Sequence, residues 1–425
     1  MIIPSIDLQN GNAVQLIGGK ERALDAGDPR PIADRFGRVG EVAVIDLDAA
    51  LGTGSNRETI LELLERAPCR VGGGIRDLQT ARFWLDAGAQ KIILGTAAEP
   101  DLLNQLPKER VIAALDAVDG DVVVEGWTKK TGRRALDRMQ ELKAYVGGFL
   151  VTFVEREGRL GGIDEAQIKA LIDAAGDASL TVAGGVATAE DVGRIDAQGV
   201  DAQVGMALYT GRFDLADATA ACLKTDREDG LWTTVVVDES GLALGLAYSD
   251  LDSLRVAINE GKGAYHSRSQ KALWIKGATS GAVQKLHSIE LDCDRDALRF
   301  AVSQSGPGFC HLDRFSCWGD STGLKRLETT LRDRKAAPAK GSYTGRLLAE
   351  EGLLAAKLRE EAEELAQADG VSDVTHEAAD LIYFAMVAMA RAGVRMTDVE
   401  KELDRRALKV TRRSGDAKRA SKEGS

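Results

Sequence analysis

The sequence predicts a multidomain protein: an α/β domain of the (β/α)8 barrel type comes first, then a compact, mainly β (α+β) domain, then an all-α helical region. The length supports this division, because 425 residues correspond to about three domains of roughly 150 residues each. Up to about residue 223, short Val- and Ile-rich runs alternate with amphipathic stretches, which is typical of repeated βα units. An internal repeat also divides this first part into two similar halves.

The predicted domain boundaries lie where this pattern changes. The alternation stops in the polar segment 225–230, so residues 1–225 are assigned to the barrel and residues 230–320 to the second domain. In the second domain, the runs TTVVVD, ALGLAY, AYHSRS, LWIKG and LHSIELDCD predict a mainly antiparallel sheet. Residues 324–411 are predicted to be helical around a loop at 334–344, and residues 412–425 to be a disordered tail.

The composition excludes several classes of protein. The chain has 66 acidic and 55 basic residues and a net charge of -11, which argues against nucleic acid as a partner. The longest apolar run, 381–390, is too short to cross a membrane. The start MIIPSIDLQN lacks the basic segment of a secretion signal, and five cysteines are too few for a disulfide framework. We therefore expect a cytoplasmic protein without a membrane partner.

The internal repeat predicts two half-barrels. IDLQNG at 6–11 matches LDAVDG at 115–120, VGGGIR at 71–76 matches VAGGVA at 182–187, and LGTAA at 94–98 matches VGMAL at 204–208. The three pairs recur in the same order at nearly one offset, so the barrel is expected to contain eight strands.

Two aspartates are candidates for catalysis in the barrel. Asp7 and Asp116 each end an apolar strand run, where barrel residues face the active site. The repeat places them across the mouth from one another, and two such carboxylates can act as general acid and general base. Either one alone could instead cap a helix. Their symmetric placement favours catalysis.

Each half also carries glycines that can let the backbone approach a phosphate, next to a helix start with free N–H groups. This predicts a ligand with a phosphate at each end. Arg76 could add a charge-assisted contact. The predicted phosphate-binding residues of the barrel are Gly73, Gly74, Arg76, Gly95, Thr96, Gly184, Gly185 and Gly205.

The first part of the chain resembles the histidine-biosynthesis isomerase that converts the aminoaldose ProFAR to its aminoketose. The matching runs are IPSIDLQNG, VIDLDAA, VGGGIR, ILGTAA, LDAVDG, EGW, AGGV and GMALYTGRF. The resemblance implies a catalytic set of Asp7 and Asp116 with Thr152. In the sixth strand, VTFVEREGRL departs from the family's YTDIxRDGTL, so Glu157 stands where an acid/base Asp is expected and Arg159 where Thr is usual.

Two alternatives follow for the barrel. A small displacement of a catalytic group can cost orders of magnitude in rate, so the barrel could be a non-catalytic module that binds phosphate. A related two-phosphate barrel, the cyclase of the same pathway, would be expected to carry Lys beside its catalytic Asp. Neither SIDLQN nor ALDAVD contains one.

Three cysteines of the second domain are candidate zinc ligands. Cys293, Cys310 and Cys317 could donate three thiolates and leave a fourth position for water, as in catalytic zinc sites. A buried cysteine is often only a small apolar residue, but the clustering of three with His311 favours a metal site.

Three aspartates in the run LDCDRD predict a second metal in the same domain. If the run is a strand, Asp292, Asp294 and Asp296 share one face and Cys293 points to the other. Three carboxylates on one face repel one another unless a hard cation lies among them, which indicates Mg²⁺.

The segment 230–320 resembles phosphoribosyl-AMP cyclohydrolase in YHSRSQKALWIKGATSG, ELDCDRDAL and GFCHLDRFSCW. The resemblance implies that zinc is bound by Cys293 of one subunit and by Cys310 and Cys317 of the other, and hence a homodimer. It also implies that zinc activates a water that opens the purine ring, and that His311 moves the proton. Ser267, Arg268 and Ser269 are expected at the 5'-phosphate, although Arg268 could also be a solvated surface charge.

The helical region carries two pairs of acids. Glu361 and Glu364 lie one turn apart in KLREEAEEL, as do Glu377 and Asp380 in EAADLIYF. Helical runs of Glu are usually solvated, but the helix 377–390 is apolar nearly all round, so its two acids are expected in buried surface. Buried carboxylates need partners, and two facing pairs would form a site for Mg²⁺.

The segment 324–410 resembles phosphoribosyl-ATP pyrophosphohydrolase, an all-helical enzyme of the MazG-like kind. The matching runs are RKAAPAKGSYTGRLLAEEG, KLREEAEEL and EAADLIYF. The resemblance implies Mg²⁺-dependent release of pyrophosphate. Glu360, next to Glu361, could join the two acidic pairs as a further ligand. Lys335, Lys340 and Arg346 could neutralise the triphosphate, or each could be a surface cation. The whole chain is therefore expected to take phosphoribosyl-ATP, phosphoribosyl-AMP and ProFAR as ligands.

Overall fold

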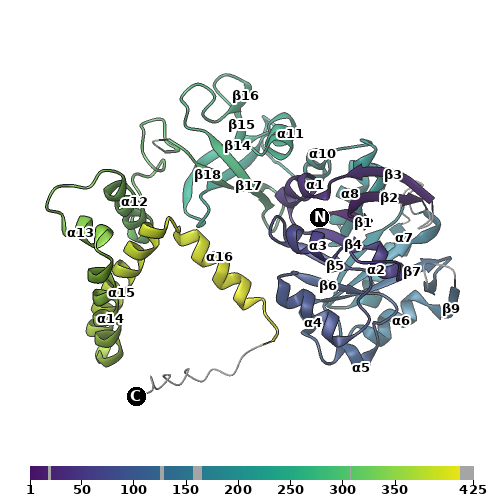
Figure 1. Cartoon of the computed structure of the whole chain (residues 1–425). Helices are drawn as coiled ribbons and strands as arrows, with labels where there is room; N and C mark the ends of the chain where they lie inside the picture. Colours follow the sequence, from purple (N-terminus) through teal and green to yellow (C-terminus); the bar gives the residue numbers. More distant parts are fainter. Residues whose placement is uncertain (18–20, 125–128, 157–164, 307, 412–425) are drawn as a thin grey trace, which may run out of the picture. The chain divides into compact units, whose positions relative to one another are not determined.

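The computed structural model describes residues 1–17, 21–124, 129–156, 165–306 and 308–411 (Figure 1). The chain divides into two compact units. The first comprises Met1–Val237, Leu246–Ser305 and Leu408–Ser425, and the second comprises Asp238–Gly245 and Gly306–Ala407. Glu157, Arg159 and the predicted tail 412–425 lie outside the described residues.

The first unit begins with a closed barrel of eight parallel strands, which confirms the predicted barrel. Its strand order is β1, β4, β5, β6, β7, β10, β11 and β12, and β12 pairs with β1 to close the ring. Parallel register links every neighbouring pair. The bounds are β1 (Ile2–Gln9), β4 (Val42–Asp46), β5 (Cys69–Gly72), β6 (Lys91–Leu94), β7 (Val111–Val118), β10 (Gly148–Phe153), β11 (Ser179–Ala183) and β12 (Asp201–Val204).

The internal repeat is visible in two antiparallel extensions of the barrel. β1 turns into β2 (Asn12–Ile17) and β3 (Glu21–Gly27), and β7 turns into β8 (Asp121–Val124) and β9 (Lys129–Arg134). The first turn of each extension has the same backbone. Its two central residues have positive φ, 52° and 80° for Asn10 and Gly11, and 52° and 81° for Asp119 and Gly120. Asn-Gly and Asp-Gly favour this two-residue hairpin turn because both tolerate positive φ.

Helices follow the barrel strands, and several begin at a side-chain cap. Asp77 accepts a hydrogen bond from the Thr80 N–H at 2.8 Å, and capping boxes start at Thr188 and Asp214; such caps satisfy N–H groups that the first helical turn leaves unpaired. The helices are α1 (Pro29–Phe36), α2 (Leu47–Leu51), α3 (Arg57–Leu64), α4 (Leu78–Ala87), α5 (Pro100–Leu103), α6 (Ala135–Leu142), α7 (Glu165–Ala175), α8 (Ala189–Asp196), α9 (Met206–Tyr209) and α10 (Leu215–Ala221). Single 3-10 turns occur at η1 (Gly37–Val39), η2 (Lys108–Arg110) and η3 (Val154–Arg156).

A buried polar network holds the loops after β1 and β4. The side chain of Asp46 accepts from the Asn56 backbone N–H at 2.8 Å and from the Asn56 amide at 2.7 Å. Asp48 accepts from the Asn10 N–H at 2.6 Å, and Asn56 accepts from the Gly11 N–H at 2.8 Å. Because buried polar groups need hydrogen-bond partners, these bonds tie the first hairpin turn to the start of α3.

Mixed sheets follow the barrel. The four-stranded sheet has the order β14, β13, β18, β17; β13 pairs with β18 in parallel and β17 pairs with β18 antiparallel. The prediction of a mainly antiparallel sheet was therefore only partly right. β15 and β16 form an antiparallel pair. The bounds are β13 (Trp232–Val237), β14 (Ala243–Ser249), β15 (Ala264–Ser267), β16 (Ala272–Ile275), β17 (Gln284–Leu291) and β18 (Ala297–Gln304).

Two elements of this region were not predicted. They are the strand β18, which lies between β13 and β17 in the sheet, and the helix α11 (Leu251–Glu260). The helix begins at a capping box formed by Asp250 and Ser253. The run ALRFAVSQ of β18 alternates buried and more exposed residues, and this alternation was the signal available in the sequence.

The second unit contains five helices among the described residues. They are α12 (Gly323–Ala336), α13 (Tyr343–Ala349), α14 (Glu351–Gln367), α15 (Gly370–Ala392) and α16 (Met396–Ala407). One residue each from α12, α13 and α14 packs with three residues of α15 to form the core: Leu331, Leu347, Leu354, Phe384, Met386 and Val387. The predicted loop 334–344 is shorter than expected, because α12 continues to Ala336 and α13 begins at Tyr343. None of the described helices is long and apolar enough to cross a membrane.

Gly73 provides a test of the barrel packing. Its φ is +90°, and a Cβ at this position would lie 2.2 Å from the Asp46 carbonyl oxygen. We expect the steric clash in Gly73→Ala to destabilise the barrel by about 1–3 kcal/mol, in addition to the cost of backbone strain. Gly88→Ala is the matched control, since Gly88 has a φ of +112° but open space around its Cβ.

Hydrogen exchange of peptides from β4 and β5 measures this difference in the full chain. Equal protection in the two variants would contradict the close approach.

Candidate active sites

The barrel mouth brings Asp7 and Asp116 to opposite sides. β1 and β7 are four strands apart in either direction around the ring. In register, Asp7 lies beside Ile45 and Asp116 beside Thr152. Beneath them, an apolar cluster of Ile93, Ile112, Leu150 and Ala183, with Ile45 and Ala114 against it, fills the interior. Because in-register residues of neighbouring strands point to the same face, both aspartates and Thr152 face the interior at the carboxyl ends of their strands.

Burial changes the acidity of the first aspartate. It raises the pKa of Asp7 from its ordinary value of 3.8 to about 7. Burial and the charge of Asp7 raise the pKa of Tyr209, whose hydroxyl donates to the Ser5 carbonyl at 3.2 Å. A carboxyl group with a pKa near neutrality is suited to proton transfer. Tyr209 was not predicted as a site residue, although it lies in the matching run GMALYTGRF.

The predicted phosphate-binding glycines occupy equivalent places in the two halves. Gly73 and Gly74 leave β5 with φ of +90° and +70°, and Gly184 and Gly185 leave β11 with +83° and +97°. All four therefore have the left-handed backbone that favours glycine. Phosphate binding at these positions stays a prediction.

The remaining barrel predictions have different surroundings. Gly95 and Thr96 are exposed after β6. Gly205 follows β12, and a Cβ there would lie 2.4 Å from the Gln15 side-chain oxygen. Arg76 donates to the carbonyls of Ala49 and Ala50 at 3.2 and 2.8 Å, so its guanidinium binds the end of α2.

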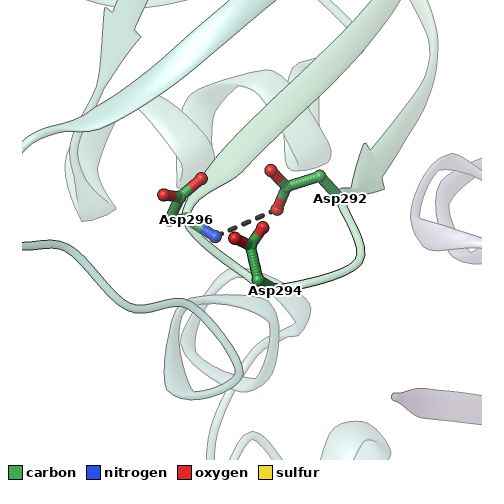
Figure 2. Close-up of side chains that lie close together, drawn as sticks. All are labelled: Asp292, Asp294 and Asp296. Carbon is green, nitrogen blue, oxygen red and sulfur yellow. Dashed lines mark hydrogen bonds between the residues drawn. The ribbon is translucent and has the colours of Figure 1, made fainter.

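The acidic run 292–296 is a turn, and its prediction as a strand was wrong. β17 ends at Leu291 and β18 begins at Ala297, while Arg295 has a φ of +69° that no strand residue adopts. The carboxylates of Asp292, Asp294 and Asp296 nevertheless converge, with oxygens within 4.8 Å of one another (Figure 2).

Hydrogen bonds and charge define this acidic turn, residues 292–296. The Asp292 carboxylate accepts from the Asp296 N–H at 3.0 Å (Figure 2). It also accepts from the Ala297 N–H at 3.1 Å. The charge of Asp294 is the largest cause that raises the pKa of Asp296. Three mutually repelling carboxylates suit a hard divalent cation, so the donor set fits the predicted Mg²⁺.

The three cysteines of the predicted zinc site are divided between the units. Cys293 is exposed in the acidic turn of the first unit, and Cys310 and Cys317 belong to the second. Cys310 is buried in a turn in which its N–H donates to the Arg314 carbonyl at 3.2 Å, and the Cys317 N–H donates to Leu244 at 2.8 Å. Thiolates are soft ligands that suit zinc. The zinc site stays a prediction, as does the role of His311, which is exposed.

The Ser-Arg-Ser segment lies at the end of β15. The Oγ atoms of Ser267 and Ser269 are 3.4 Å apart, and Arg268 is exposed. Its guanidinium lies 4.1 Å from the ring centroid of Tyr248, which was not predicted as a site residue. This cation–π contact gives Arg268 a defined place, and its binding of a 5'-phosphate stays a prediction.

The acids of the helical unit lie close together in two groups, but the expectation that Glu377 and Asp380 lie in buried surface was wrong, because Glu377 is only partly buried and the Asp380 side chain is 45% exposed. Oxygens of Glu361, Glu377 and Asp380 lie within 4.8 Å of one another, and Glu361 also groups in this way with Glu360 and Glu364. Burial, followed by the charges of Glu361 and Glu377, raises the pKa of Glu364. Glu361 is only 4% exposed. A set of carboxylates that includes a buried one fits a divalent cation.

Two lysines of the helical unit already have partners. Lys357 contacts Glu360 and Glu361, each at 2.8 Å. Lys335 was predicted in the loop but lies in the last turn of α12, where it donates to the Ala390 and Arg391 carbonyls at 2.9 and 3.0 Å.

Lysines near a helix C-terminus often satisfy its free carbonyls in this way. Of the other predicted cations, Arg346 lies in α13 and pairs with Glu350 at 3.1 Å, and Lys340 is exposed in the loop.

Three family models match successive parts of the chain. The model described as histidine biosynthesis protein matches residues 1–214, half of the chain. The chain belongs to this family. The models described as phosphoribosyl-AMP cyclohydrolase and phosphoribosyl-ATP pyrophosphohydrolase match residues 245–319 and 324–407. Each of the three family matches contains one group of candidate residues: the two barrel aspartates, the cysteines with the acidic turn, and the helical carboxylates.

Relatives of this histidine biosynthesis family member match different parts of it. A histidine biosynthesis trifunctional protein of Komagataella pastoris is 50% identical over 242 residues, 57% of this chain and 28% of that protein. The bifunctional protein his7 of Schizosaccharomyces pombe is 50% identical over 212 residues, 50% of this chain and 51% of that protein. A phosphoribosyl-substituted imidazole-4-carboxamide isomerase of Methanocaldococcus jannaschii is 36% identical over 231 residues, 51% of this chain and 97% of that protein. The chain thus spans at most about half the length of the first two relatives.

Replacing Asp7 with Asn should remove a pH-dependent cost of folding. The raised pKa means that the protonated carboxyl stabilises the barrel fully below the ordinary pKa of 3.8, and that this contribution is lost as the pH rises through about 7. The slope should approach about 1.4 kcal/mol per pH unit between these values. Hydrogen exchange of barrel peptides at several pH values measures it, and an unchanged slope in Asp7→Asn would contradict the burial of a charge.

Addition of Mg²⁺ should stabilise the helical unit. A cation at 100 times its dissociation constant stabilises the folded state by about 2.7 kcal/mol, which thermal unfolding or exchange of α14 and α15 would detect. Glu361→Gln should abolish this gain. Glu363→Gln is the matched control, since Glu363 is exposed on the same helix outside the carboxylate groups; an equal loss in both variants would argue against the site.

Proposed function

We propose that the chain catalyses three consecutive steps of histidine biosynthesis. The helical region hydrolyses phosphoribosyl-ATP to phosphoribosyl-AMP and pyrophosphate, the middle region opens the purine ring to give ProFAR, and the barrel isomerises ProFAR. The observation that carries this proposal is the succession of three family matches along one chain, each over its own group of candidate residues. The domain order is the reverse of the reaction order.

In the pyrophosphohydrolase step, the helical carboxylates Glu361, Glu364, Glu377 and Asp380, with Glu360 beside them, hold Mg²⁺. The cation neutralises phosphate charge and activates water when bound. Lys340 is exposed next to this helical bundle and is available to a triphosphate. Lys335 and Arg346 contribute less, because each already has a partner.

In the cyclohydrolase step, Cys293, Cys310 and Cys317 hold zinc and the acidic turn holds Mg²⁺. Zinc supplies an activated water when bound. His311 accepts and returns the proton, and Ser267, Arg268 and Ser269 bind the 5'-phosphate. We infer a homodimer, in which Cys293 of one subunit joins the other two cysteines of its partner, and a cytoplasmic location.

In the isomerase step, Asp7 and Asp116 face one another across the substrate. Asp7, with a pKa of about 7, exchanges a proton near neutral pH, and the glycines of both halves bind the two phosphates. The name of the Methanocaldococcus isomerase gives its substrate two phosphoribosyl groups. Two phosphates agree with two equivalent sets of phosphate-binding glycines at one end of the barrel.

The second candidate keeps both hydrolytic steps and makes the barrel a non-catalytic phosphate-binding module. It is favoured by Glu157 and Arg159, which depart from the family's sixth-strand motif. Turnover of ProFAR by the intact chain separates the two functions.

Single substitutions should remove the three activities one at a time. We expect Glu361→Gln to abolish pyrophosphate release, Cys310→Ser to abolish ring opening and Asp7→Asn to abolish isomerisation. Each variant should lose at least a hundredfold in its own step and keep the other two within twofold. The three steps are assayed separately on the full chain with phosphoribosyl-ATP, phosphoribosyl-AMP and ProFAR.

Two results would change the assignment. Absence of ProFAR turnover in the parent, with both hydrolytic steps intact, supports the binding-module barrel. Absence of all three activities in a folded parent refutes the proposed function.

A further inference from the structure

We propose that Arg295 is a positioning residue through which the barrel holds the acidic turn in its cation-binding shape. This inference rests on the proposed function only in taking the turn as a cation site. It assigns the barrel a second role, as a support for the chemistry of the sheet region that follows it.

Arg295 crosses from the acidic turn to the barrel. Its Nε donates to one carboxylate oxygen of Asp196 at 3.0 Å and its Nη2 to the other at 2.8 Å. Asp196 ends α8, and its side chain is 5% exposed. A bidentate guanidinium–carboxylate pair fixes direction as well as distance, so this contact defines where the guanidinium points.

Two further hydrogen bonds hold Arg295, one through its backbone and one through its side chain. Its carbonyl accepts from the Lys224 N–H at 2.7 Å, and its Nη1 donates to the Asp292 carbonyl at 3.3 Å. A non-glycine residue at a φ of +69° pays a conformational cost and persists where its surroundings hold it. The barrel contacts supply this support, and the left-handed residue curls the turn so that its three carboxylates converge (Figure 2).

The same contact keeps the guanidinium of Arg295 from neutralising the carboxylates of the acidic turn. Arg295 stands between Asp294 and Asp296 in the chain, and its guanidinium is directed to Asp196 instead. Without that partner, the guanidinium is free to pair with the neighbouring carboxylates and to compete with a cation for them. Loss of either Arg295 or Asp196 should therefore weaken cation binding.

Arg255 offers a matched control at the same junction. It lies in α11 and pairs with Asp214 at 2.9 Å and Asp217 at 2.7 Å, both at the start of α10. It therefore makes two hydrogen bonds to barrel carboxylates, as Arg295 does, although to two different aspartates, and it lies outside the acidic turn. Its removal tests whether any weakening of the junction disturbs cation binding.

The test measures Mn²⁺ binding to the full chain by electron paramagnetic resonance. Every variant also carries Glu361→Gln and Glu377→Gln, which remove the helical carboxylate site from the titration. We expect Arg295→Ala and Asp196→Asn each to raise the dissociation constant at least tenfold, and Arg255→Ala to change it less than twofold. Circular dichroism checks that each variant is folded. If Arg295→Ala does not fold, the Asp196→Asn variant alone tests the inference.

The outcomes separate the two proposals. If the parent with the helical site removed binds no Mn²⁺, or if Asp294→Asn leaves its Mn²⁺ binding unchanged, the turn is not a cation site and both the proposed Mg²⁺ role and this inference fail. If the parent binds Mn²⁺ and Arg295→Ala or Asp196→Asn binds it equally well, only this inference is overturned. Equal weakening by Arg255→Ala would also overturn it, since the effect would then belong to the junction as a whole.

Discussion

Closure of a parallel ring is the constraint on which the barrel site depends. When eight parallel strands close on themselves, all their carboxyl ends lie on one rim. Strands four places apart then face one another, which puts Asp7 of β1 opposite Asp116 of β7. The repeated hairpin turns at Asn10-Gly11 and Asp119-Gly120 carry this symmetry into the backbone. The rim therefore carries two similar halves.

The chain holds its important carboxylates in three different ways. Asp7 is held by burial alone, which favours the protonated form and makes proton exchange near neutrality possible. Glu361 is buried and contacts Lys357, and its carboxylate lies close to those of Glu377 and Asp380. Asp196 is paired with Arg295, so its charge serves structure. These three carboxylates thus differ in their burial and in the charges of their neighbours.

Some predicted neighbours do lie close together, because residue spacing on a regular element determines proximity. Glu361, Glu377 and Asp380 converge since two acid-bearing helices pack through their apolar faces. Predictions failed where a short segment decided the backbone. The alternation of Asp with other residues in the run 292–296 predicts a strand, yet the left-handed backbone of Arg295 makes the run a turn. Lys335 was predicted to lie in a loop, yet α12 extends past it, and its side chain donates to a carbonyl at the end of α15.

The sequence by itself determined the repeated half-barrels, the order of the three family-like regions and the residue types of each candidate site. These follow from periodicity, glycine placement and motif spacing, which are local properties of the chain. Only the tertiary structure decided which carboxylates are buried, that Arg76 and Lys335 bind carbonyls, and that Arg295 links the acidic turn to Asp196. Such contacts join residues as much as 99 positions apart, and their energies depend on desolvation and orientation that no local pattern contains.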